Sequence, residues 1–140
     1  MSEGPQLTGR CNCGAVSYTL SAPPLAVAAC HCKQCRRQSG AAYSVNLIVR
    51  ASTMQVQGDV ASWEDADTES GVPLSRDHCG TCGSPIRSVP GSSPKMIAVK
   101  AGTLDDPSRF APAMHIWVES KLPWVTIPDG LPLYPRGPQV

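Results

Sequence analysis

The sequence predicts a mainly β domain that is held together by metal ions and contains only short helical turns. Proline accounts for 14 of the 140 residues, and because it lacks a backbone N–H and interrupts helix interiors, it favours short strands and turns over a helical bundle. Apolar residues make up 41% of the chain and charged residues 16%, so a packed core is expected and a disordered chain is not. The third observation is that the seven cysteines form three tight groups.

The apolar runs between glycines and prolines predict the individual elements. Residues 15–20 alternate as a strand, with Val16, Tyr18 and Leu20 on one side. Residues 33–38 predict one or two helical turns that stop at Ser39 and Gly40. Further strands are expected at residues 25–29, 43–49, 54–56, 61–64, 74–78, 85–89, 96–100 and 114–118.

Two segments are expected to lack regular structure. Residues 64–71 are acidic and polar and predict an exposed loop. The chain after residue 122 has prolines at positions 123, 128, 132 and 135, so it is expected to lie over the sheet, anchored by Trp124, Leu131 and Tyr134. Because the sequence shows no repeats and no long linker, residues 1–140 are expected to form a single domain.

Charge and hydropathy argue against several classes of partner. The formal net charge is +1, with 12 basic and 11 acidic residues, which gives no overall electrostatic reason to bind nucleic acid or an anionic membrane. No run approaches 18 apolar residues, and the first ten residues contain no apolar segment of a signal peptide. We therefore expect a cytoplasmic protein without nucleic-acid or membrane partners. The sequence does not determine the oligomeric state, and a homo-oligomer is possible.

The cysteine spacing predicts metal binding. An odd number of cysteines cannot pair off fully in disulfides, and these occur as Cys11/Cys13, Cys30/Cys32/Cys35 and Cys79/Cys82. Each pair precedes a glycine that can take positive φ, as in zinc knuckles, so the two pairs would form one closed Cys₄ site and the triplet one open site. Two alternatives stay open: the last pair joining two of the middle cysteines, or an iron–sulfur cluster that takes a further ligand from elsewhere.

Over residues 9–135 the chain resembles the glutathione-dependent formaldehyde-activating enzymes, also called S-(hydroxymethyl)glutathione synthases. All seven cysteines match that family in order and spacing. The motifs that carry the resemblance are GRCNCGAV from Gly9, CHCKQCRRQSG from Cys30, CGTCG from Cys79, GTLDDP from Gly102, HIW from His115, Trp124, and DGLP from Asp129.

The resemblance implies an Mss4-like fold of zinc-stabilised antiparallel sheets with two Zn²⁺ ions per chain. It implies a structural zinc on Cys11, Cys13, Cys79 and Cys82, and a catalytic zinc on Cys30, Cys32 and Cys35. The family's reaction is that of a carbon–sulfur lyase, which adds the glutathione thiol reversibly to formaldehyde. The expected partners are therefore glutathione or a related thiol and a small aldehyde.

The chemistry of the open site suggests further residues. A zinc ion with three thiolates carries a formal charge of −1, so it is better suited to accepting a fourth thiolate than to making hydroxide. Lys33, Arg36 and Arg37 lie beside the ligands in sequence and are candidates to hold the carboxylates of a tripeptide thiol. His31 is a candidate to move a proton or orient the substrate, whereas His115 is expected to be a hydrogen-bonded core histidine.

Two other functions stay open at this point. One is a zinc enzyme of the same fold with a different small-molecule substrate, because fold does not fix function. The other is a zinc-stabilised binding module, which would need only the closed Cys₄ site, so the additional cysteine triplet argues against it.

Overall fold

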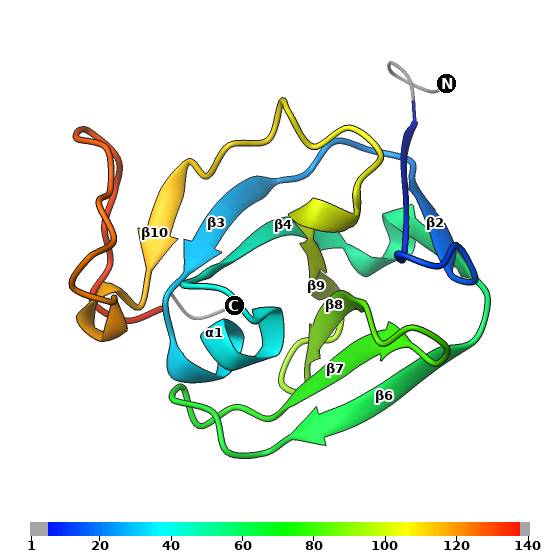
Figure 1. The fold of residues 1–140 in the computed structure, drawn as a ribbon, viewed down its shortest axis with the longest axis horizontal. Helices are drawn as coiled ribbons and strands as arrows, with labels where there is room; N and C mark the ends of the chain where they lie inside the picture. The colour runs from blue at the N-terminus through cyan, green and yellow to red at the C-terminus, as the bar shows by residue number, and fades with distance from the viewer. Residues whose placement is uncertain (1–5, 138–140) are drawn as a thin grey trace.

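The computed structural model describes residues 6–137, which form two β-sheets (Figure 1). The smaller sheet has three antiparallel strands in the order β1-β2-β5. Its strands are β1 (Leu7–Arg10), β2 (Ser17–Leu20) and β5 (Met54–Gln57). In Figure 1 the blue β1 and β2 lie at the right of the molecule, beyond the ends of β6 and β7.

The larger sheet has seven strands in the order β10-β3-β4-β9-β8-β7-β6. They are β3 (Ala26–Cys30), β4 (Ser44–Arg50), β6 (Val60–Asp65), β7 (Leu74–Cys79), β8 (Pro85–Pro90), β9 (Met96–Lys100) and β10 (Met114–Ile116). All neighbouring strands are antiparallel except β10 and β3, which are parallel. The predicted mainly β fold of antiparallel sheets with short helical turns is therefore confirmed.

The two faces of β4 have different roles because successive side chains of a strand point to opposite faces. Leu47 and Val49 are fully buried and belong to the main apolar core, which also contains Val16 and Leu20 from the segment of the smaller sheet. The alternate residues, Ser44, Asn46 and Ile48, lie on the other face, where the last two line a pocket. One face of the large sheet thus makes the core, and the other makes the floor of a pocket.

The helical turns are short, as predicted. The helix α1 (Lys33–Ser39) begins after Cys32, whose sulfur accepts a hydrogen bond from the Cys35 amide, and ends at Gly40 with φ 65°. That left-handed conformation favours glycine. Three single 3₁₀ turns follow strands: η1 (Ala51–Thr53), η2 (Ala101–Thr103) and η3 (Val118–Ser120).

The C-terminal part of the chain differs from expectation in two ways. The predicted strand over 114–118 ends at Ile116, because Trp117 adopts φ 57° and starts the η3 turn. The following segment is held along β10 by backbone hydrogen bonds, from His115 N to Pro132 O (3.1 Å) and from Tyr134 N to His115 O (2.9 Å) (Figure 1, orange to red). Trp124 and Tyr134, expected to anchor it, are 71% and 40% exposed, so that prediction is wrong for both.

The predicted loop after the sixth strand also needs a correction. Strand β6 continues to Asp65, and this carboxylate is buried in an ion pair instead of being exposed. Residues 66–73 form the loop itself and border the pocket described below.

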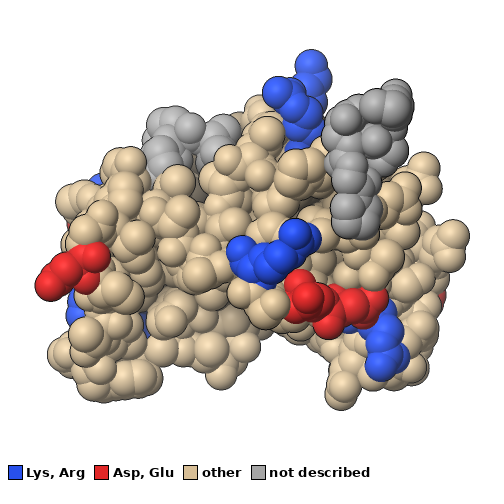
Figure 2. Space-filling model, turned by 90° about the horizontal axis from the view of Figure 1, so that it is seen from above, with Lys and Arg blue, Asp and Glu red and all other residues tan. Residues whose placement is uncertain are grey.

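The surface agrees with the balanced composition. On the face drawn in Figure 2, the described Lys and Arg side chains form separate small groups, and acidic side chains lie beside several of them. Within residues 6–137, no helix is long and apolar enough to cross a membrane.

Candidate metal centres and active-site pocket

Four cysteines that are far apart in sequence meet between the smaller sheet and the end of β7. Cys11 and Cys13 follow β1, Cys79 ends β7 and Cys82 lies in the next turn, and their sulfur atoms lie within 4.8 Å of one another. The Sγ–Sγ distances are 3.6 Å for Cys11–Cys13 and 3.8 Å for Cys13–Cys79. Zinc–sulfur bonds of about 2.3 Å in a tetrahedron place sulfurs about 3.8 Å apart. The site therefore fits a tetrahedral metal ion.

Backbone amides around this cluster point at the sulfur atoms. The Cys11 sulfur accepts a hydrogen bond from Val16 N at 3.2 Å, and the Cys79 sulfur accepts one from Thr81 N at 3.3 Å. The turns that aim these amides need glycine, since Gly14 and Gly83 have φ of 85° and 79°. N–H donors directed at sulfur stabilise thiolates, which is the protonation state that binds metal.

The remaining three cysteines form a second cluster at the junction of β3 and α1. Cys30 ends β3, Cys32 caps α1 and Cys35 lies in the first turn of that helix. Their sulfurs also lie within 4.8 Å of one another, and all three residues are buried. The structure thus brings the cysteines together as four and three, and the alternative in which the last pair joins the middle triplet does not form. Three ligands leave one coordination position of a tetrahedral ion free.

The triplet lies in a pocket of about 220 Å³. Its floor is the face of the large sheet opposite the main core, and loop 66–73, Trp117 and the C-terminal residues 136 and 137 border it. The walls are mostly apolar, and the residues that line it include Ala28, Cys30, Cys32, Cys35, Asn46, Ile48, Glu69, Val72, Leu74, Arg76, Ser88, Ala98, Lys100, Ile116, Trp117 and Arg136. The three sulfurs therefore face a ligand-sized cavity rather than the protein core.

Two buried cations in this pocket were missed by the sequence reasoning. Arg76 of β7 is 1% exposed, pairs with Asp65 at 3.0 Å and places Nη1 3.8 Å from the Cys35 sulfur. Lys100 at the end of β9 is 8% exposed and lines the same pocket. The signal was present in the sequence, because each is a cation inside a strand that was itself predicted, yet only the strand order brings them to the cysteines.

These charges act on the second cysteine cluster. Hydrogen bonds from Cys30 and Cys32 lower the pKa of Cys35 well below its ordinary value, and the charges of Lys100 and Arg76 lower it further. Burial by itself would lower the pKa of Arg76, but Cys35 and Asp65 raise it, so the guanidinium stays charged. The pocket therefore favours the thiolate form of Cys35, whereas hydrogen bonds with the neighbouring cysteines and burial raise the pKa of Cys30.

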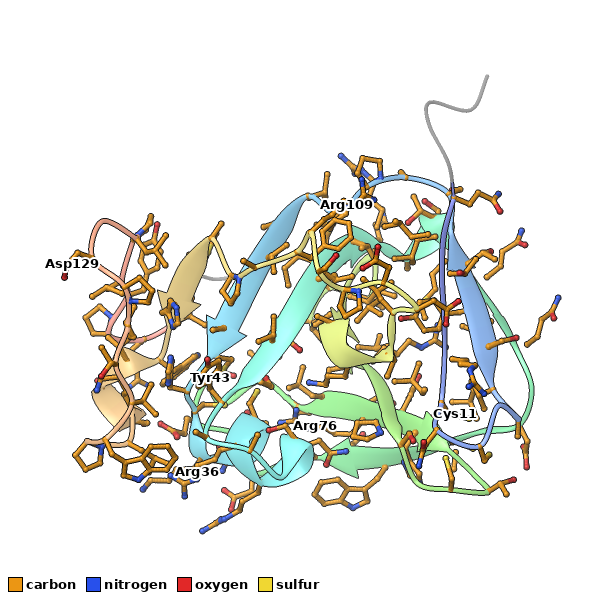
Figure 3. The ribbon with its side chains drawn as sticks, turned by 45° about the horizontal axis from the view of Figure 1, so that its top comes forward. Cys11, Arg36, Tyr43, Arg76, Arg109 and Asp129 are labelled. Atoms are coloured by element: carbon orange, nitrogen blue, oxygen red, sulfur yellow. The ribbon has the colours of Figure 1, made fainter. Side chains whose placement is uncertain are left out.

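The three cations proposed from sequence lie elsewhere. Lys33 and Arg37 are exposed on α1, Arg36 is half-buried, and none of the three lines the pocket. Figure 3 shows Arg36 on the side of α1 toward the C-terminal segment and Arg76 on the side of the large sheet. The Lys33 amide donates to Glu69 at the pocket border at 2.7 Å, which links the start of α1 to that border.

His31 points away from the pocket, as expected if its two neighbours face the metal. It is fully buried, its Nε2 lies 2.9 Å from His115 Nδ1, and its ring packs 4.9 Å from that of Tyr43. Burial lowers the pKa of His31 to about 4, so the pair is neutral near pH 7. We assign the proton of His31 to Nε2, which donates it to His115 Nδ1. The Nδ1 atom of His31 has no hydrogen-bond partner among the described residues, and in this tautomer it carries a lone pair and no buried N–H is left without an acceptor. His115 is thus a hydrogen-bonded core histidine.

The chain is similar to known proteins in sequence and in fold. The sequence profile of the family described as glutathione-dependent formaldehyde-activating enzyme matches residues 6–120. A relative from Halomonas elongata is 31% identical over 126 residues, which are 86% of this chain and 80% of that protein, and its name provisionally identifies it as a glutathione-dependent formaldehyde-activating enzyme. A crystal structure of a Rhodobacter sphaeroides protein matches 70% of this chain and 87% of its own, with a TM-score of 0.54 and 24% identity, which indicates a shared fold.

Proposed function

Because the chain belongs to the glutathione-dependent formaldehyde-activating enzyme family, we propose that it joins the thiol of glutathione to formaldehyde as a zinc-dependent carbon–sulfur lyase. In this reaction a carbon–sulfur bond forms, the carbonyl π bond breaks, and the proton of the thiol ends on the new hydroxyl. The same site would run the reverse reaction, in which S-(hydroxymethyl)glutathione releases formaldehyde. Seven free cysteines are best kept reduced in the cytoplasm, which is where we place the reaction.

One observation carries the proposal: three convergent cysteine sulfurs open into a pocket that holds two buried cations. Cys30, Cys32 and Cys35 would hold a catalytic zinc ion, which when bound supplies an exchangeable fourth position for an incoming thiolate. A fourth thiolate adds negative charge to a buried site, and such charge is unfavourable unless cations offset it. Arg76, whose Nη1 lies 3.8 Å from the Cys35 sulfur, and Lys100 line the same pocket as the triplet, which supports thiol binding over hydrolytic chemistry.

The second cluster has a different role in the proposal. Cys11, Cys13, Cys79 and Cys82 would hold a structural zinc ion that ties the start of the chain to β7. Strand β7 carries Cys79 into this cluster and Arg76 into the pocket, three positions earlier. The structural ion would therefore also fix the strand that positions a pocket cation.

The metal content can be measured directly. Elemental analysis of protein purified without chelator and resupplied with zinc should find two zinc ions per chain, because one closed and one open site are present. One zinc ion, or a substantial amount of iron, would contradict the two-site assignment.

Glutathione binding is the decisive functional test. Titration calorimetry of zinc-loaded protein should show binding of glutathione and much weaker binding of S-methylglutathione, whose sulfur cannot become a thiolate. A zinc-release dye in the same titration reports whether the thiol removes the ion instead. If millimolar glutathione does not bind fully loaded protein, the glutathione assignment fails, and a zinc enzyme with another substrate or a binding module becomes the better description.

The α1 cations Lys33, Arg36 and Arg37, which are exposed or half-buried, are proposed to contact the carboxylates of glutathione outside the pocket. Arg36→Ala combined with Arg37→Ala should weaken glutathione binding by about fivefold, or about 1 kcal/mol, since exposed charge pairs contribute little each. The effect should shrink as salt increases. Arg109→Ala, an exposed cation far along the chain, is the control. Equal affinities for the double variant and the control would remove Arg36 and Arg37 from the substrate site.

A further inference from the structure

Lys100 occupies an unusual position for a lysine. It ends β9, directly opposite Asn46 of β4 in the sheet, and its residue is 8% exposed. Buried lysines are rare unless they are paired with a carboxylate. Among residues 6–137, however, no carboxylate forms an ion pair with Lys100, whereas the other buried cation, Arg76, pairs with Asp65. The ammonium of Lys100 is thus available to interact with a molecule bound in the pocket.

A short chain of hydrogen bonds fixes the ammonium in place. Lys100 Nζ donates to Asn46 Oδ1 at 3.0 Å, and Asn46 Nδ2 donates to Ser44 Oγ at 3.0 Å. All three residues are buried. The bond to Ser44 turns the amide so that its oxygen, and not its nitrogen, faces the lysine. An ammonium has three donors, and within the described part of the chain only this one has a protein acceptor.

The strand register places Lys100 on the same sheet face as the cysteine triplet, with β4 between them. Ser44 lies opposite Cys30, and Asn46 lies opposite Lys100, so the two pairs form neighbouring rows on the pocket face. The backbones of Cys30 and Lys100 are about 7 Å apart along the strands and about 10 Å apart across them, and the Lys100 side chain extends over β4, where Nζ contacts Asn46. Charge interactions with Cys35, Cys30 and Cys32 oppose the lowering of the Lys100 pKa by burial, in agreement with this proximity.

The reaction needs a donor at this place. When a thiolate adds to an aldehyde, the electron pair of the carbonyl π bond moves onto oxygen, which becomes negative before it takes up the proton released by the thiol. A fixed N–H donor in a mostly apolar pocket stabilises such an oxygen more than it stabilises the neutral aldehyde. Resting on the proposed function, we propose that Lys100 is a catalytic residue that donates a hydrogen bond to the aldehyde oxygen during carbon–sulfur bond formation.

The competing role for Lys100 is to bind a carboxylate of glutathione. The two roles predict different kinetic changes, because a carboxylate contact would be present before and during the reaction and would affect binding alone. A contact to the developing negative oxygen would affect turnover. The burial of Lys100 and its position on the sheet favour the contact with the developing negative oxygen. The carboxylates of a tripeptide lie several bonds away from its sulfur, so they are expected farther from the cysteine triplet.

The test compares Lys100→Met and Lys100→Gln with Lys95→Met, which removes an exposed lysine just before β9. Exchange between ¹³C-formaldehyde and S-(hydroxymethyl)glutathione is followed by NMR above the uncatalysed rate, at several glutathione concentrations. Zinc content, circular dichroism and glutathione affinity are measured on each variant. Lys100→Gln keeps a neutral N–H donor, so the test survives if Lys100→Met does not fold.

We expect Lys100→Met to keep both zinc ions and to bind glutathione within about threefold of wild type, but to lose on the order of 10²- to 10³-fold in kcat. Lys100→Gln should lose less, and Lys95→Met should behave as wild type. A folded Lys100→Met variant with unchanged kcat overturns the catalytic role and leaves the proposed function intact. If that variant also binds glutathione at least tenfold more weakly, Lys100 contacts a carboxylate of glutathione instead. An inactive wild-type protein that is fully zinc-loaded overturns both.

Discussion

Removing the charge of Asp65 tests how strongly the pocket depends on its buried ion pair. Asp65 lies at the end of β6, and its Oδ2 accepts a hydrogen bond from Arg76 Nε at 3.1 Å and lies 3.0 Å from Arg76 Nη2 in the ion pair. The two side chains are 6% and 1% exposed. Asp65→Asn changes the shape of the side chain very little, yet it leaves the guanidinium buried without its carboxylate. The substitution therefore isolates the charge.

The expected loss follows from this burial. Breaking a buried ion pair by removing one partner lowers stability by about 3–5 kcal/mol, because the other charge stays desolvated and uncompensated. Such a loss is a large part of the total stability of a typical domain. With an m-value of about 2 kcal/mol/M in urea, the unfolding midpoint should fall by about 1.5–2.5 M. The Cys35 sulfur, 3.8 Å from Arg76, offsets part of the loss, so the lower end of the range is expected.

The measurement is urea unfolding followed by circular dichroism, at a fixed metal content. Glu119→Gln is the matched control, since its ion pair with Arg136 is also 3.1 Å long but has side chains that are 43% and 59% exposed. Exposed pairs of this kind contribute about 0–1 kcal/mol. If Asp65→Asn and Glu119→Gln shift the midpoint equally, the buried pair does not stabilise the fold in the way argued here.

Two further comparisons test the metal sites and one turn. Cys79→Ser should unfold or strongly destabilise the protein, because structural zinc binding contributes to folding directly. Cys32→Ser should leave a folded protein that lacks its second metal ion. Thermal melts combined with metal analysis test this, and equal destabilisation by the two substitutions would contradict the assigned roles. Gly58→Ala should destabilise by about 3 kcal/mol or more, since φ is 108° and the new Cβ would collide with the carbonyl oxygen of Ala15. Gly130→Ala, with φ 90° and open space around it, should lose only about 1–2 kcal/mol, and equal midpoints in urea would disprove the collision.

Several local features could be predicted because they depend on neighbours in sequence. The alternation at residues 15–20 predicted which side chains of β2 are buried in the core, and Gly40 predicted where α1 ends. Cys30, Cys32 and Cys35 lie within six residues, so a single turn brings them together. The exposed Trp124 shows where this reasoning failed: large apolar side chains were expected to anchor the C-terminal segment, but backbone hydrogen bonds to His115 hold it.

The sequence by itself determined the mainly β class, the cysteine triplet at residues 30–35 and the buried face of the strand at residues 15–20, because periodicity and short spacing are local properties. That Cys11 and Cys13 meet Cys79 and Cys82 was one of the possibilities left open by the spacing, and the tertiary structure decided it. Only the tertiary structure decided which strands are neighbours, and with that the contents of the pocket. Lys100 and Arg76 reach the cysteines because β9, β8 and β7 pair in that order beside β4. The alternation of a strand predicts which face of the sheet a side chain lies on, but it does not predict which strand will be the neighbour. For that reason the cations chosen from sequence were the neighbours of the cysteines along the chain, while those in the pocket are their neighbours in space.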